Sequence, residues 1–168
     1  EISACLVGSE MCIRDRHYDK KHLFTFGGEH KRFTAGTERV VVNFRGVRIL
    51  LEVCYDLRFP VWSRNLGDYD MILYVASWPT PRVDAWSALL RARAIENQCY
   101  VAGVNRMGTD PTCEYSGGSA IIDPYGKTIA ECPWSRESAV SADIDMEALQ
   151  AFRKKFPVLD DADPFTLI

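Results

Sequence analysis

The segment RVVVNFRGVRILLEVCYD, residues 39–56, constrains the fold more than any other part of the sequence. Two runs of β-branched and apolar residues, Val40–Phe44 and Val47–Val53, are separated by Arg45-Gly46. This pattern predicts a β-hairpin. The second run is apolar along most of its length, which is typical of a strand buried on both faces. We therefore expect a sheet in which this second strand is internal.

The rest of the chain alternates between predicted strands and helices. Residues 82–97 predict a helix, because apolar side chains recur there at helical spacing. The other predicted elements are a long loop at 18–38, a helical turn from Pro60, strands at Asp70–Ser77, Cys99–Val104 and Ala139–Ile144, a hairpin of 118–123 with 127–131, and a helix capped by Asp145 that runs to about Phe156. This order predicts one α/β or α+β layered domain with a mixed sheet.

Charge, apolar content and cysteine spacing exclude several classes of protein. The chain carries 20 Lys and Arg against 23 Asp and Glu and has no basic stripe, so we expect no nucleic-acid partner. No run of about 18 apolar residues occurs, so we expect no membrane span. Six irregularly spaced cysteines without a CxxC pair favour neither a disulfide scaffold nor a zinc site. Unpaired cysteines favour a reducing cytoplasm.

Residues 1–16, EISACLVGSEMCIRDR, differ from the rest of the chain. They begin without Met, show no clear helical or strand period, and resemble a translated sequencing adapter. We interpret them as non-native and residues 17–168 as the C-terminal part of a single domain. A short native lead-in is the alternative interpretation.

Cys54 is the candidate nucleophile because it ends the predicted internal strand, where a thiol is held rigidly and substrate can reach it. Most cysteines at such positions are small buried hydrophobes. The polar residues that follow, Tyr55, Asp56 and Arg58, favour a site, since burying them without use is costly. A lysine such as Lys20 would lower the pKa of the thiol and stabilise an oxyanion, although a solvated loop lysine is the simpler interpretation.

Four segments together resemble the nitrilase superfamily of carbon–nitrogen hydrolases. They are YDKKHLF at 18–24, GGEHKRFTAG at 27–36, CYDLRFPVWSRN at 54–65 and RARAIENQCYVAGVNR at 91–106. Trp78-Pro79 and the closing KFPVLDDADPFTL make the chain most similar to bacterial omega-amidases. The resemblance covers nearly all of residues 18–168.

The resemblance implies a Glu–Lys–Cys triad and the substrate residues around it. Cys54 matches the nucleophile, Lys20 the lysine, and Glu29 a second glutamate beside that lysine. The general-base glutamate has no counterpart in the sequence, so we expect this chain alone to be inactive. For substrate binding we expect the Tyr55 backbone N–H at the oxyanion, Arg82 at a substrate carboxylate and Trp78 in the pocket wall.

The resemblance also implies an α–β–β–α sandwich whose first part is missing, a homodimer formed through helix 82–97 and an extended C-terminal arm at residues 160–168, and no cofactor or metal. The expected reaction is hydrolysis of the omega-amide of small 2-oxo acid amides by way of a cysteine thioester. Two alternatives stay open. One is another small-amide or carbamoyl hydrolase of the same superfamily, and the other is a non-catalytic relative.

Overall fold

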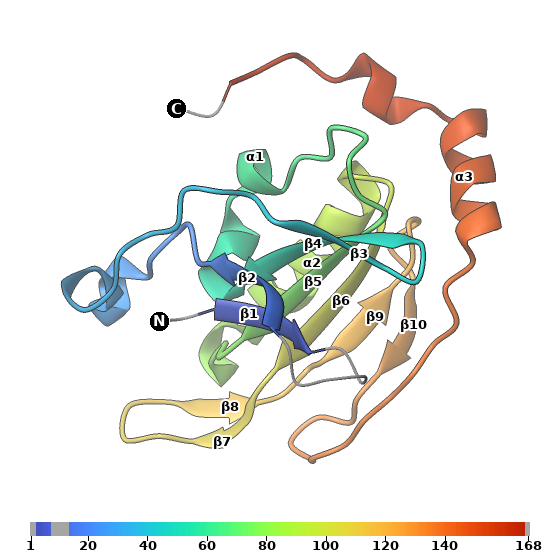
Figure 1. Cartoon of the computed structure of the whole chain (residues 1–168). Coiled ribbons are helices and arrows are strands. Elements are labelled where there is room, and N and C mark those ends of the chain that lie inside the picture. The colour runs from blue at the N-terminus through green and yellow to red at the C-terminus, as the bar shows by residue number, and fades with distance from the viewer. Residues whose placement is uncertain (1–2, 8–13, 167–168) are drawn as a thin grey trace.

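The computed structural model describes residues 3–7 and 14–166, with side chains from residue 16 onward. Its centre is a six-stranded sheet in the order β10-β9-β6-β5-β4-β3 (Figure 1). Strands β4, β5 and β6 are parallel and their outer neighbours are antiparallel, which confirms the predicted mixed sheet. The strands are β3 (Val41–Phe44), β4 (Val47–Val53), β5 (Met71–Ala76), β6 (Tyr100–Asn105), β9 (Ala120–Ile122) and β10 (Thr128–Glu131).

The predicted hairpin of β3 and β4 is confirmed, and its turn has a backbone reason. Phe44 pairs with Val47, so Arg45 and Gly46 form a two-residue turn. Their φ angles are 51° and 85°. Positive φ at both central residues matches the right-handed twist of the strands, and glycine adopts it without steric cost. The turn therefore fixes the register that buries β4.

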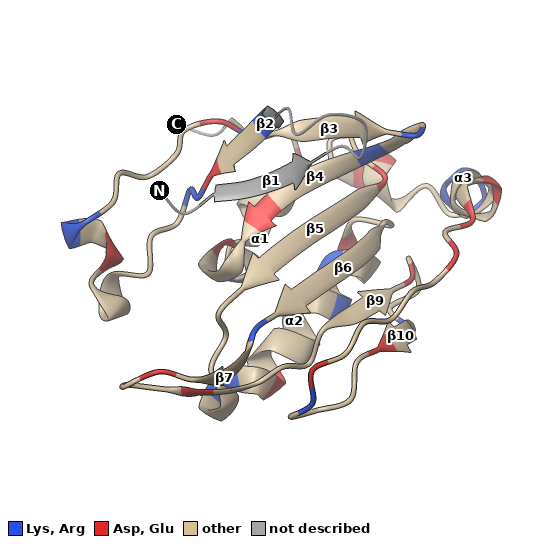
Figure 2. Cartoon of the chain, turned by 60° about the horizontal axis from the view of Figure 1, so that its bottom comes forward, with Lys and Arg blue, Asp and Glu red and all other residues tan. Residues whose placement is uncertain are grey.

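The helix α2 (Val83–Glu96) covers one face of the sheet, as its spacing predicts. Its buried residues Trp86 and Leu90 pack with Leu50, Ile72 and other strand residues in one hydrophobic cluster. Gly103 of β6 permits this close approach, because a Cβ there would lie 2.6 Å from a methyl carbon of Leu90. In Figure 2 the strands β5, β6 and β9 carry no charged residue, whereas the neighbouring β4 carries Arg48 and Glu52.

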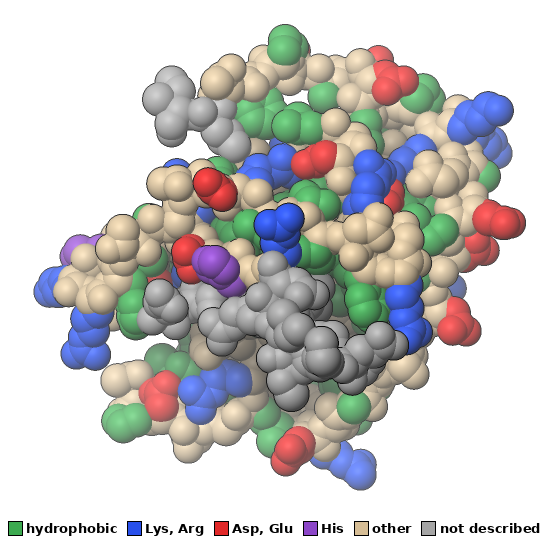
Figure 3. All heavy atoms as spheres, viewed as in Figure 1, with side chains coloured by type: hydrophobic (Ala, Val, Ile, Leu, Met, Phe, Trp, Pro, Cys, Tyr) green, Lys and Arg blue, Asp and Glu red, His purple; other side chains and the backbone are tan. Residues whose placement is uncertain are grey.

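The opposite face is covered near β4 by two strands that the sequence did not predict. Strands β1 (Ser3–Val7) and β2 (Arg14–Asp19) pair antiparallel, and β1 packs against β4. The predicted loop at 18–38 therefore starts only at Lys20, because Tyr18 and Asp19 end β2, and it contains the short 3₁₀ helices η1 (Thr25–Gly27) and η2 (Glu29–Lys31). Hydrophobic side chains remain visible on this face (Figure 3), and Val104 is 50% exposed.

Several smaller elements complete the chain. They are η3 (Cys54–Arg58), α1 (Pro60–Ser63), η4 (Thr80–Arg82), β7 (Met107–Thr109), β8 (Glu114–Ser116), α3 (Met146–Lys155) and η5 (Val158–Asp161). The hairpin of β7 and β8 was not predicted. The predicted cap of α3 is confirmed, because the Asp145 side chain accepts a hydrogen bond from the Ala148 N–H at 2.8 Å.

The predicted strand at Ala139–Ile144 is wrong. Its residues alternate between small apolar and polar types, but they lie mostly exposed and no strand hydrogen-bonds to them. Without a pairing partner, an alternating pattern does not form a strand. The last two residues of the predicted C-terminal arm lie outside the described residues. No helix in the described part of the chain is both long and apolar enough to cross a membrane.

Candidate active site

Cys54 lies at the turn where β4 ends and η3 begins. Its φ is 49°, in the left-handed region that residues with a side chain rarely adopt. Its Sγ lies 3.9 Å from the carbonyl oxygen of Ser77, which follows the neighbouring strand β5. Backbone strain of this kind persists only where surrounding structure enforces it, and it is concentrated at functional sites. The thiol is therefore held at the carboxyl ends of two parallel strands, where open α/β sheets bind ligands.

The carboxylate of Asp56 joins this turn to the segment that carries Lys20. Asp56 is fully buried. It accepts hydrogen bonds from the backbone N–H groups of Val53 at 3.1 Å and His22 at 2.8 Å. It also accepts one from the Tyr18 hydroxyl at 2.9 Å. Charge-assisted hydrogen bonds are the stronger kind, so this carboxylate holds the two segments together.

Lys20, in the segment that Asp56 holds against the Cys54 turn, forms an ion pair with Glu29. The Lys20 Nζ lies 2.7 Å from the Glu29 Oε2, and Lys20 is only 2% exposed. The same glutamate oxygen accepts a hydrogen bond from the Phe24 N–H at 2.8 Å. A buried charge is tolerated when it is paired and hydrogen-bonded. The pair therefore fixes an ammonium group inside the molecule.

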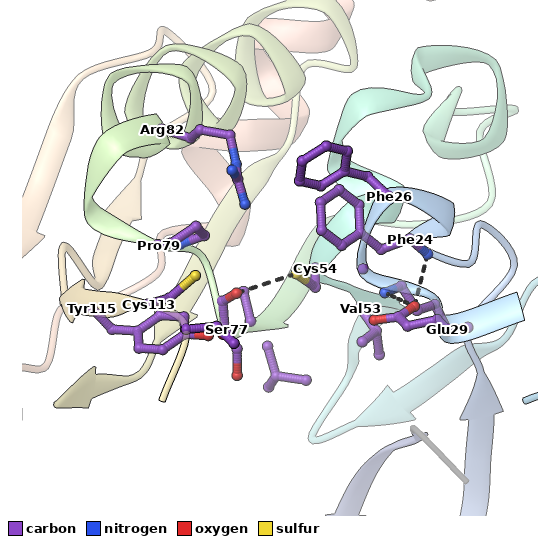
Figure 4. A pocket seen from close by; sticks show the side chains of 15 residues that line it. Phe24, Phe26, Glu29, Val53, Cys54, Ser77, Pro79, Arg82, Cys113 and Tyr115 are labelled. Carbon is purple, nitrogen blue, oxygen red and sulfur yellow. Dashed lines mark hydrogen bonds and ion pairs between the residues drawn. The ribbon is translucent and has the colours of Figure 1, made fainter. Parts of the chain in front are cut away.

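One cavity of about 860 Å³ contains the thiol and the ion pair (Figure 4). Its walls come from the end of β4, the end of β5, the η1–η2 loop and the hairpin of β7 and β8. Besides Cys54, Lys20 and Glu29, the lining residues are Phe24, Phe26, Gly27, Val53, Val75, Ala76, Ser77, Pro79, Arg82, Thr112, Cys113 and Tyr115. A concave site with a few convergent polar groups is the form that small-molecule sites usually take.

The environment of Cys54 disfavours the thiolate form. Burial raises the pKa of the Cys54 thiol above its ordinary value, and the positive charge of Lys20 acts in the opposite direction. A thiolate is the reactive form, so a nucleophile in this position needs a base to take its proton. Glu29 is the only acidic side chain that lines the cavity among the described residues, and it is engaged with Lys20 and Phe24.

Arg82 supplies a second positive charge to the cavity. It ends η4, and its guanidinium lies 5.5 Å from the centre of the Phe24 ring. Figure 4 shows the guanidinium pointing into the cavity. Within residues 16–166, Arg82 makes no ion pair with an acidic side chain. The cavity therefore presents one cation that is not neutralised by these residues.

Trp78 and Tyr55 lie beside the cavity and support its walls. Trp78 is 3% exposed, and its indole N–H donates to the carbonyl of Arg82 at 2.7 Å. The Tyr55 ring packs edge-on against Phe24 and Phe59. Both residues line a small side pocket next to Cys54. This hydrogen bond ties the Trp78 side chain to the backbone of Arg82.

Comparison with known proteins identifies the family. The family model for carbon-nitrogen hydrolases matches residues 5–154. The chain belongs to the carbon–nitrogen hydrolase family. It is 56% identical over 151 residues to omega-amidase YafV of Escherichia coli K12, which covers 89% of this chain and 59% of that protein. It is 42% identical over 148 residues to 2-oxoglutaramate amidase of Bacillus subtilis, covering 87% of this chain and 57% of that protein.

Solved structures of this carbon–nitrogen hydrolase family show the same fold. XC1258 from Xanthomonas campestris, a CN-hydrolase superfamily protein, superposes with a TM-score of 0.87 at 48% identity, covering 90% of this chain and 60% of that one. Nit3 of Saccharomyces cerevisiae, a member of the nitrilase superfamily, gives 0.78 at 25% identity, covering 87% and 54%. The predicted nitrilase-type α/β fold is thus confirmed. The chain spans about 59% of the length of the omega-amidase it matches.

The structure gathers all six residues that the sequence singled out around one site of this carbon–nitrogen hydrolase. Cys54, Lys20, Glu29 and Arg82 line the main cavity, and Tyr55 and Trp78 line the side pocket. Their catalytic roles remain predictions. No group of three or more His, Cys, Asp or Glu side chains in the described ranges is placed to hold a metal ion.

Sequence reasoning missed the wall formed by the hairpin of β7 and β8. Thr112, Cys113 and Tyr115 line the cavity from this hairpin. The available signal was the Asp110-Pro111 pair, which favours a turn. Three-residue strands are too short to show a reliable alternation, so the turn alone did not reveal the hairpin.

Proposed function

We propose that the whole protein is a thiol-dependent amidase that hydrolyses the omega-amide of small 2-oxo acid amides, such as 2-oxoglutaramate and 2-oxosuccinamate. The products are the 2-oxo acid and ammonia. The observation that carries this proposal is the single cavity shared by the Cys54 thiol and the Lys20–Glu29 ion pair. The omega-amidase and 2-oxoglutaramate amidase relatives support the choice of substrate.

The proposed mechanism follows ordinary acyl transfer. The Cys54 thiolate attacks the amide carbon and forms a tetrahedral intermediate. The Lys20 ammonium and the Tyr55 backbone N–H stabilise its oxyanion, while Glu29 holds Lys20 in place. The C–N bond breaks as the nitrogen takes a proton and leaves as ammonia. Water then hydrolyses the thioester and restores the thiol.

The mechanism needs a glutamate that takes the proton from the Cys54 thiol. Glu29 is held by Lys20 and Phe24, so we assign it to orienting the lysine. We propose that the base is not among the described residues and that the 168-residue chain alone has negligible activity. Loss of a general base costs about 10²–10⁴-fold in rate. A purified chain of these 168 residues that turned over 2-oxoglutaramate at ordinary enzyme rates would contradict this.

We assign Arg82 to the substrate carboxylate. Its guanidinium points into the cavity, and no acidic side chain among the described residues neutralises it. A guanidinium matches the planar geometry of a carboxylate and binds it through two parallel hydrogen bonds. Cys54 and Arg82 line both the main cavity and the side pocket, so we expect one substrate to contact both residues.

The test is ammonia release from 2-oxoglutaramate by the protein expressed from the complete reading frame. Cys54→Ala is expected to abolish release, whereas Cys132→Ala, at a thiol outside the cavity, is expected to keep it. Activity that survives Cys54→Ala would contradict the proposal. A clear preference for amides without a 2-oxo acid group would favour another small-amide or carbamoyl hydrolase. Absence of any hydrolysis would favour a non-catalytic relative.

We also propose that the protein is a homodimer in a reducing cytoplasm. A groove between α1, the end of α2 and the C-terminal arm is lined by Val61 and Phe165, which are 54% and 40% exposed. The groove is also lined by Arg64, Glu96, Asp161 and Asp163, and protein–protein interfaces combine apolar and charged side chains in this way. The four described cysteines that remain free support a reducing compartment. Light scattering that finds only monomer at every concentration would contradict the dimer.

A further inference from the structure

The hairpin of β7 and β8 lies outside the six-stranded sheet and forms one wall of the cavity. Its strands pair antiparallel, with Met107 opposite Ser116 and Thr109 opposite Glu114. β8 packs against η4, the element that carries Arg82. Figure 4 shows Cys113 and Tyr115 on the same side of the cavity as Arg82, across from Phe24 and Phe26. The hairpin therefore forms the wall of the cavity on the side that also contains Arg82.

A single carboxylate, that of Asp110, organises this wall. Its Oδ1 accepts hydrogen bonds from the Thr112 N–H at 2.8 Å, the Thr112 hydroxyl at 2.7 Å and the Cys113 N–H at 2.9 Å. Its Oδ2 accepts one from the Tyr115 hydroxyl at 2.7 Å. The Asp110 N–H donates to the Cys113 carbonyl at 2.9 Å. All three hairpin residues that line the cavity are thus bonded to the same side chain.

These hydrogen bonds also settle the charge of Asp110. The Tyr115 and Thr112 donors hold the pKa of the Asp110 carboxyl well below its ordinary value, so it is ionised at neutral pH. Arg106 lies against the Tyr115 ring, 4.4 Å from its centre. The Tyr115 hydroxyl is bonded to Asp110, and neither Asp110 nor Arg106 lines the cavity. The three hairpin residues that do line it, Thr112, Cys113 and Tyr115, are uncharged residue types.

We propose that Asp110 is a positioning residue for substrate recognition, which holds Thr112, Cys113 and Tyr115 as the wall that limits acyl chain length beside Arg82. This rests on the proposed function, in which the cavity is the amidase site. The substrate class that fits is a short amide with one carboxylate. A longer chain meets the wall, and a second negative charge finds no further free cation among the described lining residues.

The test compares Asp110→Asn with Asp123→Asn in the protein from the complete reading frame. Asp123 is a matched control, because its Oδ1 accepts the Tyr125 and Lys127 N–H groups in the turn between β9 and β10, away from the cavity. An asparagine at 110 keeps its size, but its NH2 group is a donor, so one oxygen can no longer accept both the Tyr115 hydroxyl and the donors of Thr112 and Cys113. The measurement is kcat and KM for omega-amides of increasing acyl length.

Asp110→Asn is expected to raise KM for the shortest amide about tenfold, which is the effect of one lost hydrogen bond of ordinary strength. Its kcat should change little, and its preference for short over long amides should shrink. Tyr115→Phe, which removes the same hydrogen bond from the other side, should reproduce the effect. Asp123→Asn should leave all three quantities unchanged.

Three outcomes separate this inference from the function on which it rests. If Cys54→Ala is inactive but Asp110→Asn behaves like Asp123→Asn, the inference is overturned and the amidase proposal stands. If Asp110→Asn lowers kcat and leaves KM unchanged, the inference is also overturned. If Cys54→Ala keeps its activity, the proposed function itself fails. Should Asp110→Asn not fold, the result with Tyr115→Phe decides in the same way.

Discussion

The hydroxyl of Tyr18 donates a hydrogen bond to Oδ2 of Asp56 at 2.9 Å, across 38 positions of the sequence. Both residues are fully buried. The same hydroxyl accepts hydrogen bonds from the Trp62 indole N–H at 3.0 Å and the Lys21 N–H at 3.1 Å. Burial, reinforced by the negative charge of Asp56, raises the pKa of Tyr18 far above its ordinary value. One neutral hydroxyl therefore holds the segment of Lys20 against the turn of Cys54.

Tyr18→Phe is expected to lower the free energy of unfolding by about 1–3 kcal/mol, because it leaves buried donors without an acceptor. Urea denaturation of the 168-residue chain measures the change. Tyr125→Phe is the matched control, since Tyr125 is 67% exposed and its loss should shift stability by less than about 0.5 kcal/mol. Equal denaturation midpoints for the two variants would show that the buried hydroxyl does not stabilise the fold.

The parts of the fold that depend on local pattern could be predicted from the sequence. Arg45-Gly46 specifies a turn by backbone conformation alone, and α2 follows from the spacing of its apolar residues. The predicted strand at Ala139–Ile144 was wrong because its local pattern is not sufficient to form a strand. A strand also needs a hydrogen-bonding neighbour, and a pattern within one segment carries no information about that neighbour.

The site could be predicted only where a motif marked it. Cys54, Lys20 and Glu29 belong to segments that resemble a known family, and the structure places them at one cavity. The Asp56 network joins residues more than 30 positions apart, so no local pattern reveals it. The wall held by Asp110 was missed because its two strands have three residues each.

Glu52 makes stability depend on pH. It is fully buried on β4, and its Oε2 accepts a hydrogen bond from the Ser63 hydroxyl at 2.9 Å. Burial, with a further contribution from Asp56, raises the pKa of Glu52 from 4.5 to about 8. The fold therefore retains a proton that the unfolded chain releases above pH 4.5. Its stabilising contribution is complete below pH 4.5 and is lost as the pH rises to about 8.

Glu52→Gln is expected to remove this part of the pH dependence, because glutamine has a similar shape and stays neutral. Relative to the parent chain, the variant should gain stability steadily between pH 5 and pH 8. Unfolding by urea at several pH values measures it. The stability of Glu137→Gln, at an exposed position, should change with pH in the same way as that of the parent chain. A parallel curve for Glu52→Gln as well would mean that Glu52 is not protonated in the fold.

The positive φ of Cys54 predicts an unusual order of stability for two variants. Both Cys54→Gly and Cys54→Ala remove the thiol, but only glycine adopts a φ of 49° without steric cost. Cys54→Gly should therefore be more stable than Cys54→Ala by about 1 kcal/mol. At the exposed Ala88 of α2 the order reverses, since Ala88→Gly should cost about 1 kcal/mol. If the glycine variant were the less stable one at both positions, the backbone at Cys54 would not be strained.

The charge of Lys20 should control how fast the Cys54 thiol reacts, even in the 168-residue chain. Burial raises the pKa of Cys54 most; Lys20 lowers it, and Glu29 and Asp56 raise it further. Lys20→Met therefore removes the favourable charge and leaves the unfavourable ones. Below the pKa, each unit of increase lowers the thiolate fraction about tenfold. Alkylation of Cys54 by iodoacetamide at pH 8, followed by mass spectrometry, should therefore slow in Lys20→Met.

Two controls separate this charge effect from a change in access. Lys21→Met removes an equal charge from the neighbouring residue, whose ammonium lies 5.2 Å from the centre of the Trp62 ring and outside the cavity. Its alkylation rate at Cys54 should match that of the parent chain. Cys113 lines the same cavity, so an unchanged rate there shows that reagent still enters. Equal slowing at Cys54 and Cys113 in Lys20→Met would indicate that the cavity has closed, and the role of the Lys20 charge would be refuted.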